Sequence, residues 1–276
     1  MPRLDRMALA LTIVSLASVV PAIGDDKAPD GPPRPRTVFL IGDSTVKNGS
    51  GKGGGGLWGW GNFLGQHLDP SQARVENRAL GGRSSRTYLT EGLWGKVLAD
   101  LRPGDVVLIQ FGHNDGGPLD TGRARASLKG AGEETKDVVV EATKKAETVH
   151  TYGWYLRKYI AEARARGATP VVLSPVPRNL WNAEGKVVRA SKDYGKWAAE
   201  AARAEGVAFV DLNDIAATHY EQDGKAKVES TYFTPADHTH TTEAGARVSA
   251  ASVAEGLWTI PDGPLADAFK APATAK

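Results

Sequence analysis

The sequence of 276 residues contains no cysteine. A structural disulfide, a thiolate metal site and a cysteine nucleophile are therefore excluded. Charge of one sign is also lacking, because 34 Lys and Arg residues stand against 32 Asp and Glu residues. This near balance, without a dense stripe of basic residues, gives no indication of a nucleic-acid partner. A chain of this length can still bury a substantial core without covalent cross-links.

Long apolar runs are absent after the first 24 residues. At the start, Arg3 and Arg6 precede an uncharged run from Met7 to Val20, and small residues follow at the spacing of a cleavage site. The run is shorter than the roughly 20 residues that a membrane-spanning helix needs, so residues 1–24 are predicted to be a secretory signal peptide. An uncleaved N-terminal anchor is the alternative. The prediction implies a secreted or periplasmic protein with no stable membrane association after cleavage.

The rest of the chain alternates between short apolar runs and segments of helical periodicity. Residues 25–36, rich in proline and charge, are predicted to be a linker, residues 37–258 one domain and residues 259–276 a flexible tail. Residues 112–147 are polar and are predicted to run over the surface. The pattern predicts strands at 37–41, 73–77, 106–110, 169–174 and 207–211, and helices at 60–68, 91–100, 151–166, 191–205 and 242–257.

This alternation predicts an α/β fold in which helices cover both faces of a mainly parallel sheet. The carboxyl ends of parallel strands meet at one edge of the sheet, where such folds place their sites. Three polar segments follow predicted strands: Ser44 after the first, Gly81-Gly82 after the second, and Gly112 to Asp115 after the third. We therefore expect these segments to converge.

Each of the three segments also has a simpler explanation. Ser44 can be a nucleophile only with a base beside it, and alone it is better explained as a helix N-cap. The amide of Asn114 can donate to an oxyanion, but an Asx-turn accounts for it as well. The paired glycines can present a backbone N–H to a ligand, or they form a plain turn.

The segment Asp237-His238-Thr239-His240 contains the candidate base. A histidine can take a proton from a serine and return it to a leaving group, while an aspartate fixes its tautomer. An aspartate three residues before the histidine can do so only if the loop turns back on itself. A surface loop is one alternative, and a zinc site that adds His113 to these side chains is another.

In this order, the segments resemble the sequence blocks of the SGNH (GDSL-type) hydrolases. The matching residues are Gly42-Asp43-Ser44, the glycine of Gly81-Gly82, Gly112-His113-Asn114-Asp115 and Asp237-x-x-His240. The resemblance spans residues 37 to about 257. Within the family, the sequence is most similar to rhamnogalacturonan acetylesterases, on the evidence of Trp60-Gly61, Gly82-Arg83-Ser84, Phe111 to Gly117 and Asp237 to Thr241.

The resemblance implies a flavodoxin-like, three-layer α/β/α sandwich with a central parallel sheet. It implies that Ser44 is the nucleophile, that His240 is the general base and then the general acid, and that Asp237 orients His240. The oxyanion hole would consist of the backbone N–H groups of Ser44 and Gly82 and the side-chain amide of Asn114. No cofactor or metal is expected.

Two choices within these motifs rest on spacing. Gly82 is preferred to Gly81 as the glycine of the second family block, because Gly82 begins the Gly-Arg-Ser sequence of that block. His240 is preferred to His238 because it stands three residues after Asp237, in the Asp-x-x-His spacing. Arg83, His113 and Trp181 are predicted to bind substrate, since an arginine can face a uronic acid carboxylate and a tryptophan can stack on a sugar ring.

The predicted function is that of a secreted serine esterase that removes O-acetyl groups from a plant cell-wall polysaccharide, rhamnogalacturonan in particular. The acetylated polysaccharide is expected to bind as substrate. The alternatives are a general carboxylesterase or lipase-like enzyme on the same fold, a noncatalytic glycan-binding protein, and a metal-dependent hydrolase. The glycine-rich loop at residues 49–56 looks expanded relative to the family pattern and is a candidate wall of the site.

Overall fold

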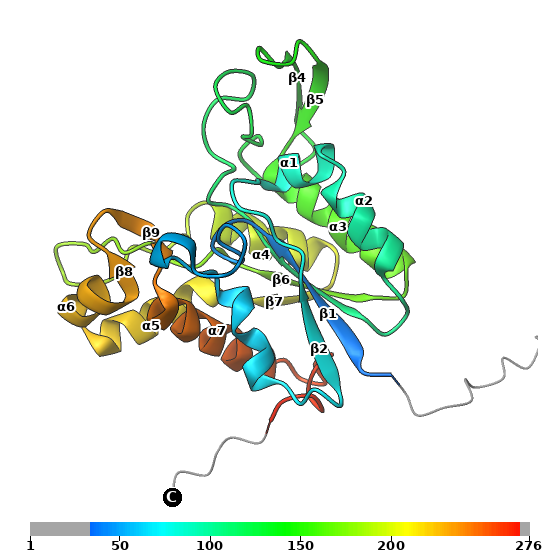
Figure 1. Ribbon diagram of the computed structural model, residues 1–276. Helices are drawn as coiled ribbons and strands as arrows, with labels where there is room; N and C mark the ends of the chain where they lie inside the picture. Colours follow the sequence, from blue (N-terminus) through cyan, green and yellow to red (C-terminus); the bar gives the residue numbers. More distant parts are fainter. Residues whose placement is uncertain (1–33, 271–276) are drawn as a thin grey trace, which may run out of the picture. The chain divides into compact units, whose positions relative to one another are not determined.

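The computed structural model describes residues 34–270 (Figure 1). The predicted signal peptide, most of the predicted linker and the last six residues of the predicted tail lie outside this range. Within residues 34–270, no helix combines the length and the apolar character needed to cross a membrane.

The centre of the fold is a sheet of five strands that all pair in parallel. The strands follow the spatial order β2-β1-β3-β6-β7. This arrangement confirms the predicted α/β fold with a central parallel sheet. The strands are β1 (Arg36–Gly42), β2 (Ala73–Asn77), β3 (Val106–Gln110), β6 (Thr169–Leu173) and β7 (Ala208–Val210).

Helices cover both faces of this sheet (Figure 1). Alternate residues of a strand point to opposite faces, so Val38 and Leu40 pack in one apolar layer while Phe39 and Ile41 pack in the other. The Phe39 layer is covered by α1 (Ser85–Thr90), α2 (Leu93–Asp100), α3 (Tyr152–Ala165) and α4 (Tyr194–Ala204). The Val38 layer is covered by α5 (Leu212–Asp223) and α7 (Glu243–Trp258).

The predicted helix at 60–68 is wrong, because the segment forms two short 3-10 turns, η2 (Trp60–Asn62) and η3 (Leu64–His67). The first N–H groups of the segment pair with the loop after β1: Trp60 N donates to Thr45 O at 3.0 Å, and Gly61 N donates to Val46 O at 3.0 Å. The next ones reach back only three residues, as in a 3-10 turn, with Phe63 N donating to Trp60 O at 3.0 Å. A Cβ at Gly61 would lie 2.8 Å from the backbone oxygen of Val46, so only glycine permits this approach.

The polar stretch 112–147 contains structure that the sequence pattern did not predict. It enters a hairpin of β4 (Thr135–Val139) and β5 (Ala146–His150), which protrudes beyond α1 in Figure 1. Helix α5 was also not predicted. It begins where the side chain of Asp211 accepts a hydrogen bond from Asp214 N.

The predicted flexible tail is wrong for residues 259–270. Leu265 and Ala268 are buried in the same apolar layer as Val38. The carbonyl of Ala268 accepts a hydrogen bond of 2.8 Å from Asp69 N. The alanine- and proline-rich composition predicts a loose tail, but the apolar side chains of Leu265 and Ala268 close the edge of the core.

Two further elements stand near the carboxyl edge of the sheet. A short α6 (Lys225–Lys227) continues into a π-helical turn, η4 (Val228–Tyr232). The chain then forms a small antiparallel pair of β8 (Phe233–Thr234) and β9 (Asp237–Thr241). The sequence pattern had placed an extended loop at 237–240.

Arg86 connects α1 to the polar stretch 112–147 that leads into the hairpin. Its side chain, only 1% exposed, makes two hydrogen bonds to the carboxylate of Glu147, at 2.7 and 2.8 Å. It also donates to the carbonyls of Leu119 and Ala126. These contacts hold both ends of this stretch against α1.

We expect Arg86→Ala to lower the free energy of unfolding by about 3 kcal/mol or more. The substitution leaves the carboxylate of Glu147 and the carbonyls of Leu119 and Ala126 without a donor, while they stay largely buried. Urea denaturation measures this change. Lys196→Ala is the control, since it removes only an exposed pair with Glu200, and it should cost less than about 1 kcal/mol. Equal losses in the two variants would contradict this account of Arg86.

Candidate active site

Ser44, His240 and Asp237 form one hydrogen-bonded chain. His240 Nε2 lies 2.8 Å from Ser44 Oγ, and His240 Nδ1 lies 2.7 Å from Asp237 Oδ2. A carboxylate only accepts hydrogen bonds, so Nδ1 donates to Asp237 and Nε2 is left to accept the serine proton. The hydrogen bond predicted between Ser44 and His240 is therefore present, and His238 does not take its place.

The turn that brings Asp237 back to His240 is built by its own carboxylate. Asp237 Oδ1 accepts from the backbone N–H groups of Thr239, at 2.8 Å, and His240, at 2.9 Å. Burial raises the pKa of Asp237, but these hydrogen bonds and the imidazole of His240 outweigh it and hold the pKa below its ordinary value. Asp237 is therefore a carboxylate when it orients the ring.

The ring of His238 makes no hydrogen bond with this chain of residues. The residue is exposed, and its carbonyl accepts a hydrogen bond of 2.8 Å from Asn179 N. The strand that carries these histidines is held beside the glycine-rich loop, because Trp58 N donates to Thr241 O at 2.9 Å. The expanded loop at 49–56 thus ends at a residue, Trp58, that pairs with β9.

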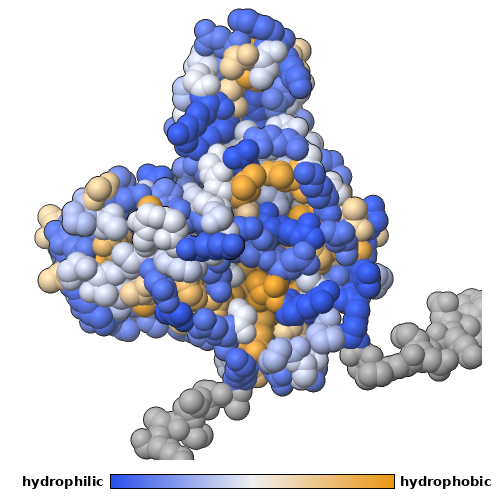
Figure 2. Space-filling view, viewed as in Figure 1, coloured by the Kyte–Doolittle hydropathy of each residue, from blue (hydrophilic) through white to orange (hydrophobic). Residues whose placement is uncertain are grey.

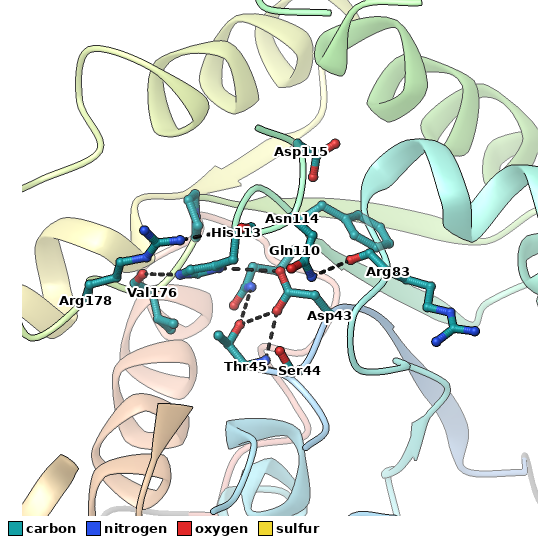
Figure 3. Close-up of polar contacts among 12 residues, drawn as sticks. Asp43, Ser44, Thr45, Arg83, Gln110, His113, Asn114, Asp115, Val176 and Arg178 are labelled. Carbon is teal, nitrogen blue, oxygen red and sulfur yellow. Dashed lines mark hydrogen bonds and ion pairs between the residues drawn. The ribbon is translucent and has the colours of Figure 1, made fainter. Parts of the chain in front are cut away.

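The loop after β1 is fixed by Asp43, which is fully buried. Asp43 Oδ1 accepts from Thr45 N at 2.8 Å and from Thr45 Oγ1 at 2.7 Å (Figure 3). Burial alone would raise the pKa of Asp43, yet the imidazole of His113 and the hydrogen bonds from Thr45 lower it below its ordinary value. Ser44 therefore stands between two residues that hold each other in place.

Asn114 follows β3 and is 7% exposed. Its Nδ2 donates to the carbonyl of Arg83 at 2.9 Å (Figure 3). That bond uses one amide hydrogen, and among the described residues the other hydrogen has no protein acceptor. The bond also ties Asn114 to the segment of Gly82, whose φ of +79° is a left-handed conformation that favours glycine.

The neighbouring Gly81 makes the closer contact with the serine, because a Cβ built on it would lie 3.4 Å from Ser44 Cβ. The carbonyl of Gly82 accepts from Arg125 Nη1 at 3.1 Å. The two glycines therefore pass beside Ser44 and Asn114.

Asp115 was part of a quoted motif but received no role from the sequence. It is fully buried and accepts hydrogen bonds from Ser85 N, at 3.1 Å, and from the hydroxyls of Ser85 and Ser127. Burial raises its pKa to about 6, although these hydrogen bonds lower it. Asp115 connects the residue after Asn114 to the start of α1. No spacing signal in the sequence could have identified these partners.

The three predicted substrate-binding residues differ in their surroundings. Arg83 is paired with Glu91 at 2.9 Å, and Figure 3 shows its guanidinium directed away from Ser44. The side chain of His113 is only 6% exposed and faces Asp43. Trp181 packs beside the cluster of Val187 and Tyr220, and its Nε1 donates to Asn179. The polar side-chain atoms of His113 and Trp181 thus face groups of the protein itself, and Arg83 is held by an acidic partner.

A cavity of about 320 Å³ lies beside this site, on the side of β6. It adjoins the site through His113, which lies in its wall and faces Asp43 on the other side. Arg178 also lines it, and among the described residues no carboxylate pairs with this arginine, whose Nη2 lies 3.5 Å from His113 O. The apolar part of the wall consists of Pro175, Val176, Pro177, Leu180, Val188 and Ala190.

The residues required for the zinc alternative do not come together. Across residues 34–270, no group of three or more His, Asp or Glu side chains is placed to hold a metal ion. His113 is separated from the two other histidines by its contacts with Asp43 and with the carbonyl of Val176.

Comparison with known proteins identifies relatives over most of the chain. A rhamnogalacturonan acetylesterase of Emericella nidulans is 34% identical over 215 residues, which are 78% of this chain and 82% of the relative. A probable rhamnogalacturonan acetylesterase of Bacillus subtilis is 35% identical over 80% of this chain and 91% of the relative.

Solved structures share the fold. A Bacillus subtilis protein, YxiM, matches with a TM-score of 0.64 at 24% identity, over 83% of this chain and 57% of that one. An acetylxylan esterase from Geobacillus stearothermophilus matches with a TM-score of 0.54 at 18% identity, over 81% of this chain and 94% of that one. At these identities the structures show the fold alone.

The sequence also matches the GDSL-like lipase/acylhydrolase family over residues 40–248. This stretch contains the serine, the asparagine, the aspartate and the histidine described above. The chain therefore belongs to the GDSL-like lipase/acylhydrolase family.

Proposed function

We propose that the protein is a serine esterase that removes O-acetyl groups from a carbohydrate polymer, and from rhamnogalacturonan in particular. The observation that carries the chemistry is the continuous chain of hydrogen bonds from Ser44 through His240 to Asp237. The substrate is supported by the relatives named rhamnogalacturonan acetylesterase, which match this chain over most of their length.

In this mechanism Ser44 Oγ attacks the acetyl carbonyl while His240 Nε2 takes its proton. Asp237 keeps Nδ1 protonated and stabilises the imidazolium. The oxyanion accepts hydrogen bonds from the free amide hydrogen of Asn114 and from the backbone N–H groups of Ser44 and Gly82. His240 then protonates the sugar hydroxyl that leaves. Water, activated by the same histidine, releases acetate and restores Ser44.

The triad is tested by measuring acetate release from acetylated rhamnogalacturonan and hydrolysis of p-nitrophenyl acetate. We expect Ser44→Ala and His240→Ala each to lower kcat by about 10⁴-fold or more, because each removes a group that acts as part of one unit. His238→Ala is the matched control in the same strand and should keep kcat within about threefold, since its side chain makes no contact with the triad.

Circular dichroism of each variant shows whether the fold is intact. A chelator should leave the wild-type rate unchanged. Activity that survives Ser44→Ala, or that disappears with chelator alone, would contradict the serine mechanism.

We assign the sugar part of the substrate, which leaves as the alcohol, to the cavity lined by Arg178. Its volume is that of a small-molecule site, and its wall combines apolar residues with polar ones that include two arginines, Arg178 and Arg189, and one carboxylate, Asp193. Arginine binds carboxylates through two parallel hydrogen bonds, and the guanidinium of Arg178 has no acidic partner among the described residues. We therefore assign this arginine to the carboxylate of a uronic acid unit next to the acetylated sugar.

This assignment predicts a selective loss. Arg178→Gln should raise KM for acetylated rhamnogalacturonan by about tenfold or more, the effect of one lost charged hydrogen bond, and should leave p-nitrophenyl acetate hydrolysis unchanged. The same variant should no longer distinguish the native polymer from one with carboxyl groups reduced to alcohols.

Arg83→Gln is the control, because that arginine is already paired with Glu91. An Arg178→Gln enzyme that still prefers the native polymer over the reduced one would exclude Arg178 as the carboxylate-binding residue.

A general carboxylesterase or lipase-like enzyme is the second candidate on this fold. On the face shown in Figure 2, hydrophobic residues form separate patches between hydrophilic ones, and no continuous apolar surface extends over it. This favours a substrate with a short acyl group on a polar alcohol over an ester with a long acyl chain. Greater activity on long-chain esters than on acetylated polysaccharide would support the second candidate instead.

The proposal includes export from the cytoplasm, which rests on the sequence of residues 1–24. Expression of the full chain in a bacterial host should yield mature protein in the periplasm or medium, with an N-terminus at or near Asp25. Edman sequencing of the purified protein measures the start. A cytoplasmic protein that keeps Met1 would contradict export.

A further inference from the structure

A chain of buried polar contacts runs beneath Ser44, from η2 to the strand end of β6. Trp60 Nε1 lies 2.7 Å from Gln110 Oε1, and Gln110 Nε2 lies 2.8 Å from Thr45 Oγ1. The indole nitrogen can only donate, so the amide oxygen faces Trp60 and the amide nitrogen donates to Thr45. The hydroxyl of Thr45 therefore directs its hydrogen to Asp43 Oδ1, at 2.7 Å.

The other end of this chain fixes the protonation of His113. His113 Nε2 lies 3.1 Å from the carbonyl of Val176, which can only accept, so Nε2 carries a hydrogen (Figure 3). His113 Nδ1 lies 3.4 Å from Asp43 Oδ2. Both atoms are buried, and within the described residues neither has a partner at ordinary hydrogen-bond geometry, so each faces only the other. A neutral ring would direct a lone pair at a carboxylate, so a proton is required between them.

Asp43 is the partner that stays ionised. Its Oδ1 accepts two hydrogen bonds from Thr45, and hydrogen bonds to the charged form favour the carboxylate. The other charged groups that act on Asp43 are Asp115 and Arg125, which have opposite signs. Arg178 approaches only the carbonyl of His113. The proton therefore belongs on Nδ1 of the ring.

The two partners each stand next to a residue of the proposed mechanism. Asp43 precedes Ser44 and His113 precedes Asn114, so the contact joins the loop after β1 to the loop after β3. The distance between the serine and the oxyanion-hole amide depends on how these two loops are held together. A misplacement of about 1 Å in such a pair can cost about 10²-fold in rate.

We propose that His113 is a positioning residue that, as an imidazolium bound to the Asp43 carboxylate, holds Ser44 and Asn114 in register. This role rests on the proposed serine mechanism, and it replaces the substrate contact that the sequence suggested for His113. The ring acts through Asp43 and through its own backbone, and it does not touch the reacting atoms.

The protonation state can be measured without any assay of activity. The protein contains six histidines, and the ¹⁵N ring signals that disappear in His113→Asn identify His113. We expect both ring nitrogens of His113 to carry hydrogen at neutral pH in the wild type. In Asp43→Asn the bonds from Thr45 keep the amide oxygen in place and direct the NH₂ group at His113, so Nδ1 should lose its hydrogen.

A wild-type ring without hydrogen on Nδ1 would overturn the proposal, whatever the enzyme proves to hydrolyse. A ring that stays doubly protonated in Asp43→Asn would overturn it too, because Asp43 would then not be its partner. These spectra therefore separate a failure of this inference from a failure of the proposed function.

Two replacements of His113 test positioning. The amide of Asn can occupy the place of Nδ1 and donate to Asp43, whereas the amide of Gln reaches the place of Nε2 and donates to Val176. We expect His113→Gln to lower kcat on p-nitrophenyl acetate by about tenfold or more with KM unchanged. His113→Asn should keep kcat within about threefold of the wild type.

The urea midpoint of each variant separates loss of fold from loss of positioning. Equal values of kcat for the two variants at equal stability would show that the contact with Asp43 does not set the rate, and would overturn the positioning role.

Discussion

The constraint on which this structure depends is that all five strands of the sheet run in one direction. Every strand of this sheet therefore ends at the same edge, and each connection between them must run back to the opposite edge before the next strand begins. Ser44 leaves that edge after β1 and Asn114 leaves it after β3. Because β1 and β3 are direct neighbours in the sheet, a serine and an amide that are 70 positions apart in the sequence lie in adjacent loops.

His240 is not on this sheet, and other contacts bring it to the edge. Strand β9 is held by its pairing with Trp58 and by the bond from Asn179 to the carbonyl of His238. Both partners belong to loops that themselves follow strands of the sheet, β1 and β6. The base is thus positioned by the same edge that positions the nucleophile, although its own strand lies outside the five-stranded sheet and pairs with β8 in the opposite direction.

The buried polar contacts below the site make this arrangement specific. From Trp60 through Gln110 and Thr45 to Asp43, each donor has one acceptor, and the direction of every hydrogen is set by its neighbour. A network of this kind is stabilising only when all its members are satisfied. A single apolar replacement would leave a buried donor or acceptor without a partner, so the network favours one conformation of the loop that carries Ser44.

The sequence by itself determined the elements whose signal is local. The short apolar run from Val106 to Gln110, which follows a turn, predicted a strand that the structure contains. The motifs around Ser44, Asn114 and His240 already indicated the residues that the fold brings together. The sequence did not reveal that residues 60–68 lack an α-helix or that Leu265 packs in the core.

Those features are decided by partners far away in the chain. Trp60 pairs with Thr45, and Leu265 packs in the layer of Val38. The same holds for His113, which the motif offered as a ligand for substrate. The tertiary structure turns its ring toward Asp43. A buried imidazole is stable only beside a polar or charged partner. That partner lies 70 residues earlier in the sequence, so the motif alone could not reveal it.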